Sequence, residues 1–319
     1  MINSTSSPIK ANNLLNNSPM IVLILLLAES LHFVFARLLL PYLPPVTSSF
    51  YYMTVATVQI GLYAAVTRRI KWRIFRENAL FFLIIGFLIA AATSMSFSSV
   101  AYIDPGTASM IARMNTIFTL GFGIFWLKES MVRGEKIGAI IAIIGVFVIS
   151  FQPGDGSRAL WLGPVLVLGS NFAYALHAAI VKRQGESLDP TNFLLFRMMT
   201  SILFLFIFAV WRGEMAWPGG GPTGGEVWWV LLLVATVNVT ISRSLYYVAL
   251  RRFRLSILTV LLTLSPVATI LWSLALFGER PTLQGLLGGT AVILGVVFVT
   301  LSKRKKRANR HKPVVELTN

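Results

Sequence analysis

The sequence predicts an all-α fold: a polytopic membrane protein with ten transmembrane helices in two inverted five-helix repeats. Three observations support this fold class. The 319-residue chain is 55% hydrophobic and only 13% charged, whereas a soluble domain carries roughly 25% charged residues. Its apolar runs reach the length of about 20 residues that a helix needs to cross a bilayer. One pattern of alanine, histidine, glutamate and glycine positions also occurs in both halves of the chain.

Ten apolar segments are expected to cross the membrane. They cover about residues 20–41, 48–67, 79–100, 106–127, 137–152, 159–181, 192–211, 226–249, 255–277 and 282–301. The fifth is short, so we expect it to tilt or to borrow flanking residues. The first has full span length and no small-residue cleavage site, which favours a transmembrane helix over a removed signal peptide.

Residue pairs at two constant spacings define the internal repeat. Residues 128–151 and 278–301 pair at a spacing of 150, through Glu129/Glu279, Gly138/Gly288 and Gly145/Gly295. Earlier parts of the two halves pair at a spacing of 145, through Ala28/Ala173, Leu31/Leu176, His32/His177, Arg37/Lys182 and Pro45/Pro190. Because each copy holds five spans, the second copy enters the membrane in the opposite orientation. Inverted repeats support alternating access around a site near the bilayer midplane, which indicates a transporter.

The repeat also sets the predicted domain organisation. We expect a cytoplasmic tail at 1–19, a first repeat at 20–152, a second, inverted repeat at 159–301 and a basic cytoplasmic tail at 302–319. Basic residues lie mainly in the segments that face the cytoplasm when the N-terminus is inside, and the outer segments hold only Arg158, Arg212 and Arg280. This bias predicts a multi-pass protein of the inner or plasma membrane, with both termini cytoplasmic.

The net charge of +16 does not indicate nucleic-acid binding, since the basic residues form short runs that face anionic lipid. The chain has no cysteine, which excludes disulfides, thiol catalysis and cysteine-ligated metals. No HExxH, P-loop, GxSxG or DFG-type motif occurs, so neither ATP-driven transport nor hydrolysis is supported. We therefore expect a monomeric, non-enzymatic protein without cofactor or metal.

Local patterns predict several details of the helices. Asp104-Pro105 forms an N-cap and N1 proline, and Pro266 should free the carbonyl of Leu262 and kink its helix. The paired glycines at 138 and 145 and at 288 and 295 each lie on one helix face and predict close packing. The third span is rich in serine, for which close packing is the first expectation and cavity lining the second: Ser94, Ser96, Ser98 and Ser99.

Glu29 is the only carboxylate deep within a predicted span. A carboxylate there is costly unless it faces a cavity or a partner, and burial favours proton exchange near neutral pH. His32 lies three residues later, on the same helix face, and also titrates near neutrality. We expect this pair to bind protons or substrate at the midplane; the alternative is a structural Glu–His hydrogen bond within the helix.

Two arginines within the spans, Arg113 and Arg243, indicate an anionic or zwitterionic substrate, because guanidinium groups bind carboxylate or phosphate in a fork geometry. Snorkelling toward the membrane surface is the alternative for both. The remaining candidates for substrate binding are polar residues of the sixth and eighth spans: Asn171, Asn238, Ser242 and Tyr246. Arg37 and Arg197 lie near span ends and are expected to act as surface anchors, while Glu129 and Glu279 are expected to cap or pair locally.

These patterns resemble the EamA-type branch of the drug/metabolite transporter superfamily. An apolar helix, a glutamate turn and a helix with paired glycines occur twice, and VALRRFRLSILTVLLTLSPVATILWSLALFGERPTLQGLLGGTAVILG at 248–295 matches best. The first copy departs from the pattern, with Thr116 at the position of Pro266. Ala28-Glu29, together with Ala101-Tyr102-Ile103, is also similar to the small multidrug resistance branch, and that resemblance implies proton and cationic-drug binding by Glu29.

The expected function is secondary active transport of a small polar metabolite, amino-acid-like or an organic anion, with Glu29 and His32 handling protons. The family resemblance implies export. A proton-coupled exporter of lipophilic cations is the first alternative; it fits Glu29 but not two intramembrane arginines. A membrane enzyme or receptor is the second, and it lacks a catalytic cluster and a large extramembrane domain.

Overall fold

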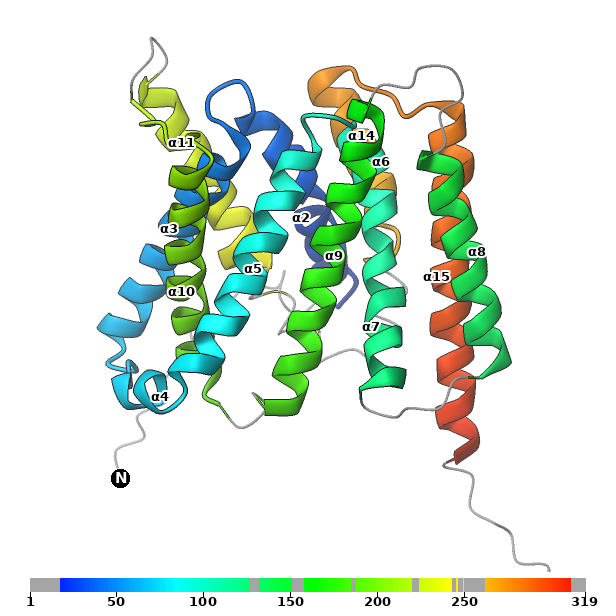
Figure 1. Ribbon diagram of the computed structural model, residues 1–319, viewed down its shortest axis with the longest axis horizontal. Helices are drawn as coiled ribbons and strands as arrows, with labels where there is room; N and C mark the ends of the chain where they lie inside the picture. Colours follow the sequence, from blue (N-terminus) through cyan, green and yellow to red (C-terminus); the bar gives the residue numbers. More distant parts are fainter. Residues whose placement is uncertain are drawn as a thin grey trace, which may run out of the picture.

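The computed structural model describes residues 18–126, 132–150, 158–184, 188–219, 224–242, 245, 249 and 262–310. Throughout these residues the chain is helical and contains no strand, which confirms the all-α prediction. The helices run roughly along one direction and form a single bundle (Figure 1).

Helices of the first half of the chain follow the predicted segments closely. They are α2 (Ser18–Leu39), α3 (Pro45–Val66), the short α4 (Trp72–Glu77), α5 (Ala79–Ser99), α6 (Pro105–Ile111), η1 (Ala112–Met114), α7 (Asn115–Phe125) and α8 (Arg133–Ser150). The predicted fourth span is therefore present, but the 3-10 turn η1 interrupts it.

The second half is also helical where it is described. Its elements are α9 (Arg158–Gln184), α10 (Pro190–Trp211), α11 (Gly224–Ala235), η2 (Thr236–Ile241), α14 (Ser265–Phe277) and α15 (Leu283–Arg310). The segment η2 is π-helical and continues α11. The eighth predicted span is thus irregular where the sequence predicted a continuous helix.

Six helices of the described residues are long and apolar enough to cross a membrane. They lie at Met20–Leu39, Ala79–Ser99, Pro105–Phe125, Trp161–Gln184, Pro190–Trp211 and Leu283–Ser302. The other predicted segments coincide with α3, α8, α11–η2 and α14. Large apolar side chains face outward along the bundle, among them Ile140, Ile144 and Phe147 of α8. An apolar exterior of this kind is suited to lipid, so the chain is a multi-pass membrane protein.

The predicted N-cap of α6 is confirmed. The Asp104 carboxylate accepts a hydrogen bond of 2.8 Å from the backbone N–H of Thr107, and Pro105 occupies the first helical position. Asp189 caps α10 in the same way, by accepting from the backbone N–H of Asn192 at 3.0 Å. Each cap satisfies a backbone donor that a helix start leaves unpaired.

The paired glycines pack as the sequence predicts, and they join α8 to α15. A Cβ atom on Gly145 would lie 2.6 Å from the carbonyl oxygen of Gly288, and one on Gly138 would lie 2.6 Å from that of Gly295. The earlier glycine of each helix meets the later glycine of the other, so the two helices are antiparallel. Their backbones approach so closely because no side chain separates them.

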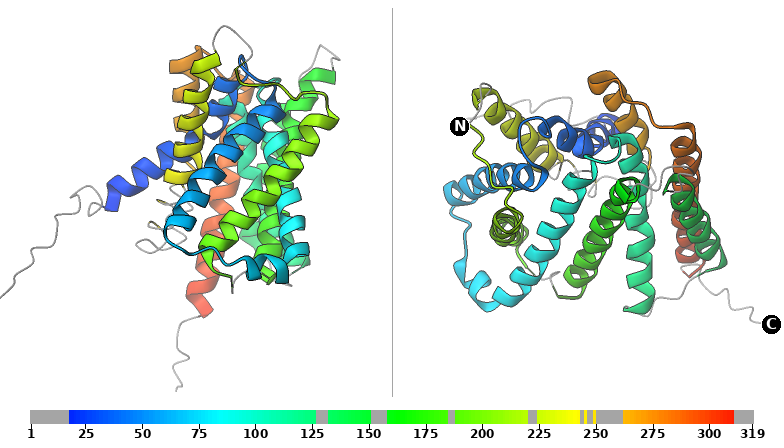
Figure 2. Two further views of the ribbon diagram at one scale, coloured as in Figure 1. Left: turned by 90° about the vertical axis from the view of Figure 1, so that its left-hand side faces the viewer. Right: turned by 45° about the horizontal axis from the view of Figure 1, so that its top comes forward.

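Other contacts connect the two halves throughout the bundle. Neighbouring pairs include α5 and α9, α3 and α10, α5 and α10, α2 and α14, and α7 and α9. The largest apolar core draws side chains from both halves, and in it the rings of Tyr52 and Phe97 stack with centroids 4.9 Å apart. Figure 2 shows the same bundle from two further directions.

An ion pair ties α2 to the turn before α15. Arg37 donates from Nε to Glu279 Oε1 at 2.9 Å and from Nη1 to the backbone carbonyl of Val100 at 2.8 Å. The structure therefore differs from the expectation of a surface anchor and a locally paired glutamate. Because α2 ends where α15 begins, the start of α2 and the end of α15 both point toward the opposite end of the bundle (Figure 1).

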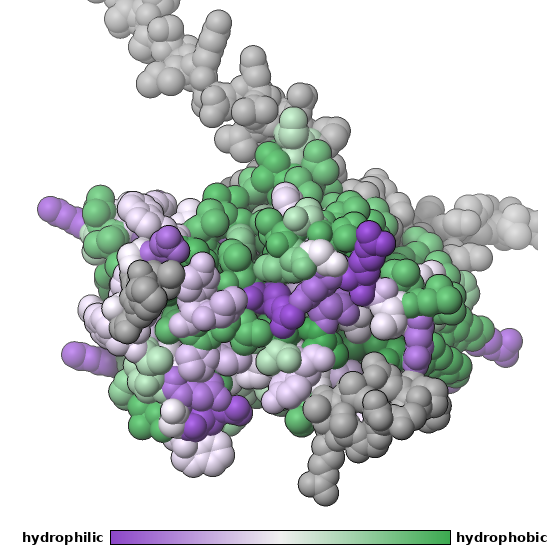
Figure 3. All heavy atoms as spheres, turned by 90° about the horizontal axis from the view of Figure 1, so that it is seen from above, coloured by the Kyte–Doolittle hydropathy of each residue, from purple (hydrophilic) through white to green (hydrophobic). Residues whose placement is uncertain are grey.

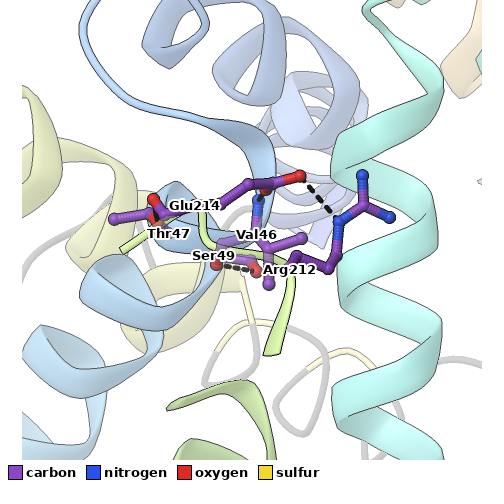
Figure 4. A network of polar contacts seen from close by, with 5 residues as sticks. All are labelled: Val46, Thr47, Ser49, Arg212 and Glu214. Atoms are coloured by element: carbon purple, nitrogen blue, oxygen red, sulfur yellow. Dashed lines mark hydrogen bonds and ion pairs between the residues drawn. The ribbon is translucent and has the colours of Figure 1, made fainter. Parts of the chain in front are cut away.

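A second network closes the same end of the bundle between α3 and the loop after α10 (Figure 4). The Glu214 carboxylate accepts from the backbone N–H of Val46 at 3.3 Å and from Nε of Arg212 at 2.6 Å, and Thr47 donates to its backbone carbonyl. Glu214 thus caps α3, whose own N-cap residue Pro44 offers no side-chain acceptor. From this end, hydrophilic residues gather across the middle of a largely apolar surface (Figure 3).

Candidate functional site

The candidate site begins with two titratable side chains on α2. His32 contacts two other elements: its Nε2 lies 2.8 Å from Ser96 Oγ of α5, and its Nδ1 lies 3.2 Å from Asn238 Nδ2 of η2. An amide nitrogen only donates, so Nδ1 accepts and Nε2 carries the ring proton and donates to Ser96. This assignment, made from the hydrogen bonds, describes a neutral histidine.

Glu29, about one helical turn before His32 on α2, is bonded at the end of the same segment that His32 contacts. Ser242, directly after η2, donates from Oγ to Glu29 Oε1 at 2.6 Å. Ser242 is 1% exposed, so this hydrogen bond lies inside the bundle. Glu29 and His32 therefore each bind another helix, which differs from the alternative of a Glu–His bond that merely stiffens α2.

Arg113 lies at a break in its own helix and reaches a break in another. It belongs to η1 and donates from Nη1 to the backbone carbonyl of Leu262 at 3.1 Å. Leu262 O is the carbonyl that Pro266 was predicted to free, since proline lacks the N–H that would bind it. α14 begins only at Ser265, with Pro266 in its first turn, and residues 250–261, on which the predicted kink also depends, lie outside the described residues.

The guanidinium of Arg113 keeps binding capacity. Its Nε is buried and has no hydrogen-bond partner among the described residues. It also lies close enough to Glu29 for an electrostatic interaction. Arg113 therefore does not snorkel to the membrane surface. Its side chain stays within the bundle, where Nη1 donates to Leu262 and Nε remains available as a donor.

Another polar contact joins the two halves of the chain. Tyr174 of α9 and Thr93 of α5 share a hydrogen bond of 3.1 Å between their hydroxyls. At the spacing of 145, Tyr174 corresponds to Glu29 and Thr93 to Asn238. This hydrogen bond, like the one between Ser242 and Glu29, therefore joins a helix of the first half to one of the second.

The structure gathers part of the predicted set. Glu29, His32, Asn238 and Ser242 form one polar cluster, and Arg113 lies nearby. Asn171 instead donates to the carbonyl of Val167 on its own helix, at 2.7 Å. The last two predicted residues, Arg243 and Tyr246, lie outside the described residues.

Several residues of this region were missed or only partly anticipated. Ser96 was expected first to pack closely and second to line a cavity; it is 1% exposed and its hydroxyl contacts His32 of α2, which accords with close packing. Tyr174, Thr93 and Gln59 were not considered. A glutamine in the middle of an apolar span was the available signal for Gln59, since polar side chains within membranes tend to bind one another.

The cluster combines a proton acceptor, a neutral histidine and hydrogen-bond donors from three different helices. Such a set suits reversible binding of protons and of a small polar molecule rather than bond-breaking chemistry, for which an activated nucleophile is needed. Within the described residues, no group of three or more histidine, aspartate or glutamate side chains could hold a metal ion.

Comparison with known proteins identifies related sequences. The model of the EamA-like transporter family matches this chain twice, at residues 18–151 and 161–301. "Uncharacterized transporter YyaM" of Bacillus subtilis is 22% identical over 266 residues, which cover 82% of this chain and 86% of that protein. "Uncharacterized inner membrane transporter YhbE" of Escherichia coli is 23% identical over 299 residues, covering 83% and 85% of the two chains.

A solved structure, described as "Crystal structure of protein", has the same overall arrangement. It superposes with a TM-score of 0.59 and 16% sequence identity, and covers 90% of this chain and 98% of that one. At this identity the similarity concerns the fold alone.

Proposed function

This chain belongs to the EamA-like transporter family, and from that premise we propose that it moves a small polar metabolite across the membrane by alternating access. The transported compound is amino-acid-like or an organic anion, and transport is proton-coupled and directed outward. The polar cluster around Glu29 and His32, with Arg113 beside it, is the observation that carries this proposal.

The architecture that this function needs is ten spans in two inverted repeats, 20–152 and 159–301. Support comes from α8 and α15, which pack antiparallel through glycines that are equivalent between the repeats. The contact between α7 and α9 also has a counterpart in the contact between α14 and α2. Such paired contacts would let the two halves exchange conformations, which is the basis of alternating access.

The substrate class follows from the charges near the cluster. Arg113 has donors that no described residue uses, and a guanidinium binds a carboxylate with two parallel hydrogen bonds. Glu29, which interacts electrostatically with Arg113, could hold an ammonium group or a proton. A zwitterion or an organic anion satisfies both groups, whereas a lipophilic cation would leave Arg113 unpaired.

The proposed proton coupling depends on the hydrogen bonds of Glu29 and His32. His32 is neutral as placed, and protonation of Nδ1 would turn it from an acceptor into a donor. Asn238 would then have to rotate its amide and present its oxygen. Protonation would thereby change a contact between α2 and η2, two elements from different proposed repeats. We place the cytoplasm at the end of the bundle that carries the start of α2, on the distribution of basic residues.

Flux in proteoliposomes tests the proposal. Purified protein is reconstituted, and the efflux of labelled amino acids and organic anions is measured with and without a pH gradient. We expect wild-type flux to depend on the gradient, and Glu29→Gln to remove this dependence. Glu226→Gln is the matched control, because Glu226 is an exposed carboxylate at the start of α11. Normal pH dependence in Glu29→Gln would exclude the proton role.

Export of lipophilic cations is a second candidate function, favoured by the aromatic surroundings of His32. The rings of Phe33 and Phe97 contact its imidazole edge-on, at centroid distances of 5.0 and 5.8 Å. Resistance of cells to a panel of cationic drugs separates the two candidates. A broad rise in resistance without metabolite flux would favour this second function.

A further inference from the structure

Gln59 of α3 contacts both ends of the π-helical segment η2. Its Nε2 donates to Thr236 Oγ1 at 2.8 Å, and its Oε1 accepts from Thr240 Oγ1 at 2.8 Å. One amide group therefore uses its donor and its acceptor on two threonines four residues apart. The polar cluster described above does not include Gln59.

The π-helical geometry of η2 is unusual and needs a cause. A π-helix closes i→i+5 hydrogen bonds, is rare, and occurs mostly as single turns at functional sites. Its turn holds about one residue more than an α-helical turn, so conversion to α-helix would rotate the following residues by about 100°. Asn238 lies within η2 and Ser242 directly after it. Both bind α2 only if the π turn is kept.

We propose that Gln59 is a positioning residue that holds η2 in its π-helical form and thereby directs Asn238 toward His32 and Ser242 toward Glu29. The bridge ties both threonines to α3, so η2 cannot turn about its axis without breaking one of the two hydrogen bonds. The role in transport rests on the proposed function. The role in geometry does not, and it is measured separately.

Cross-linking measures the geometry without any transport. The natural chain has no cysteine, and Ala249, beyond η2, forms a buried cluster with Ile21 and Leu25 of α2. Leu25→Cys with Ala249→Cys therefore gives a reporter of the helix rotation after η2. A rotation of about 100° would carry the two Cβ atoms beyond the roughly 4.5 Å that a disulfide tolerates.

In this reporter background, Gln59→Met should lower the disulfide-formation rate about tenfold, because both threonine contacts are lost. Gln59→Glu should restore the rate, since a carboxyl group accepts from both threonine hydroxyls. Thr57→Val is the matched control: it removes a buried hydroxyl of α3 that binds only Met53 O of its own helix. An unchanged rate in Gln59→Met would overturn the proposal.

If Gln59→Met does not fold, the near-isosteric pair Thr236→Val and Thr240→Val removes the same bridge from the other side. This double variant should lower the cross-linking rate as Gln59→Met does. Where Gln59→Met and the double threonine variant both fold, combining them should lower the cross-linking rate no further than either does alone, because both eliminate the same bridge. Additive effects, or a normal rate in the threonine variant, would also overturn the proposal.

Flux measurements test the consequence for transport. Gln59→Met should shift the pH midpoint of flux, because Asn238 and Ser242 would no longer be directed toward His32 and Glu29. Thr57→Val should leave the midpoint unchanged. Absence of flux in the wild type would contradict the proposed function and leave the cross-linking result intact. Normal flux with an unshifted midpoint in Gln59→Met would contradict the role of Gln59.

Discussion

The contact between α8 and α15 yields a sharp prediction about Gly145. Gly145→Ala should destabilise the protein, although alanine favours helix formation over glycine by about 1 kcal/mol. The added Cβ would lie 2.6 Å from the carbonyl oxygen of Gly288 and 2.7 Å from the backbone nitrogen of Val292. Backbone atoms cannot turn away as the end of a flexible side chain can, so the two helices would have to separate.

The magnitude follows from the distances. Ordinary van der Waals contact begins at 3.4 Å, so the backbones must move apart by about 0.8 Å. Overpacking of this kind costs about 1–3 kcal/mol, and the gain in helix propensity offsets about 1 kcal/mol. We expect a net loss of up to about 2 kcal/mol in the free energy of unfolding.

Gly121→Ala in α7 is the matched control, because a Cβ there meets no atom within 4 Å. The same substitution should be neutral or should stabilise by up to about 1 kcal/mol. Thermal unfolding of the purified proteins in one detergent gives the comparison, at about 2–4 °C per kcal/mol. Equal melting temperatures for the two variants would refute the close-contact argument.

Two further predictions concern the ends of the helices. Glu279→Gln should lower stability by about 1–2 kcal/mol, between the values for surface and buried ion pairs, since the side chains of Arg37 and Glu279 are 31% and 23% exposed. Glu77→Gln is the control, because it breaks a far more exposed ion pair and should have little effect. Equal losses of stability for the two variants in chemical denaturation would contradict this prediction. Asp189→Ala should cost about 1 kcal/mol at neutral pH. Hydrogen bonds from Asn192 hold the pKa of Asp189 below its ordinary value of 3.8, so the cap stabilises above that pH and its contribution is lost as the pH falls further. The unfolding curves of Asp189→Ala and the wild type should converge in acid, and a constant gap would exclude the cap's ionisation as the cause.

The sequence predicts those parts of the structure in which a local rule acts alone. The N-cap at Asp104 follows from capping chemistry, and the released carbonyl of Leu262 follows from the missing N–H of Pro266. The close packing at the paired glycines follows from their spacing on one helix face, although the spacing does not identify the partner helix. Each of these features requires only a few neighbouring residues, so tertiary structure confirms them without changing them.

The partners of the polar residues could not be predicted in this way. Glu29 and His32 were expected to act as a pair, but each binds an element more than 60 residues away. Arg37 was expected at the surface and instead binds Glu279. Which helix faces which is decided by the packing of the whole bundle, and one sequence contains no direct record of it. Asn171 illustrates the limit, because only the structure reveals that it binds its own helix.

Broken helices and polar side chains coincide in this protein for a common physical reason. In an apolar medium every backbone N–H and C=O needs a partner, and a break in a helix leaves some without one. Arg113 donates to the carbonyl at one break, and Gln59 bridges threonines across another. Both irregular segments lie beside the candidate site, since Arg113 of η1 lies near Glu29, and Asn238 of η2 contacts His32.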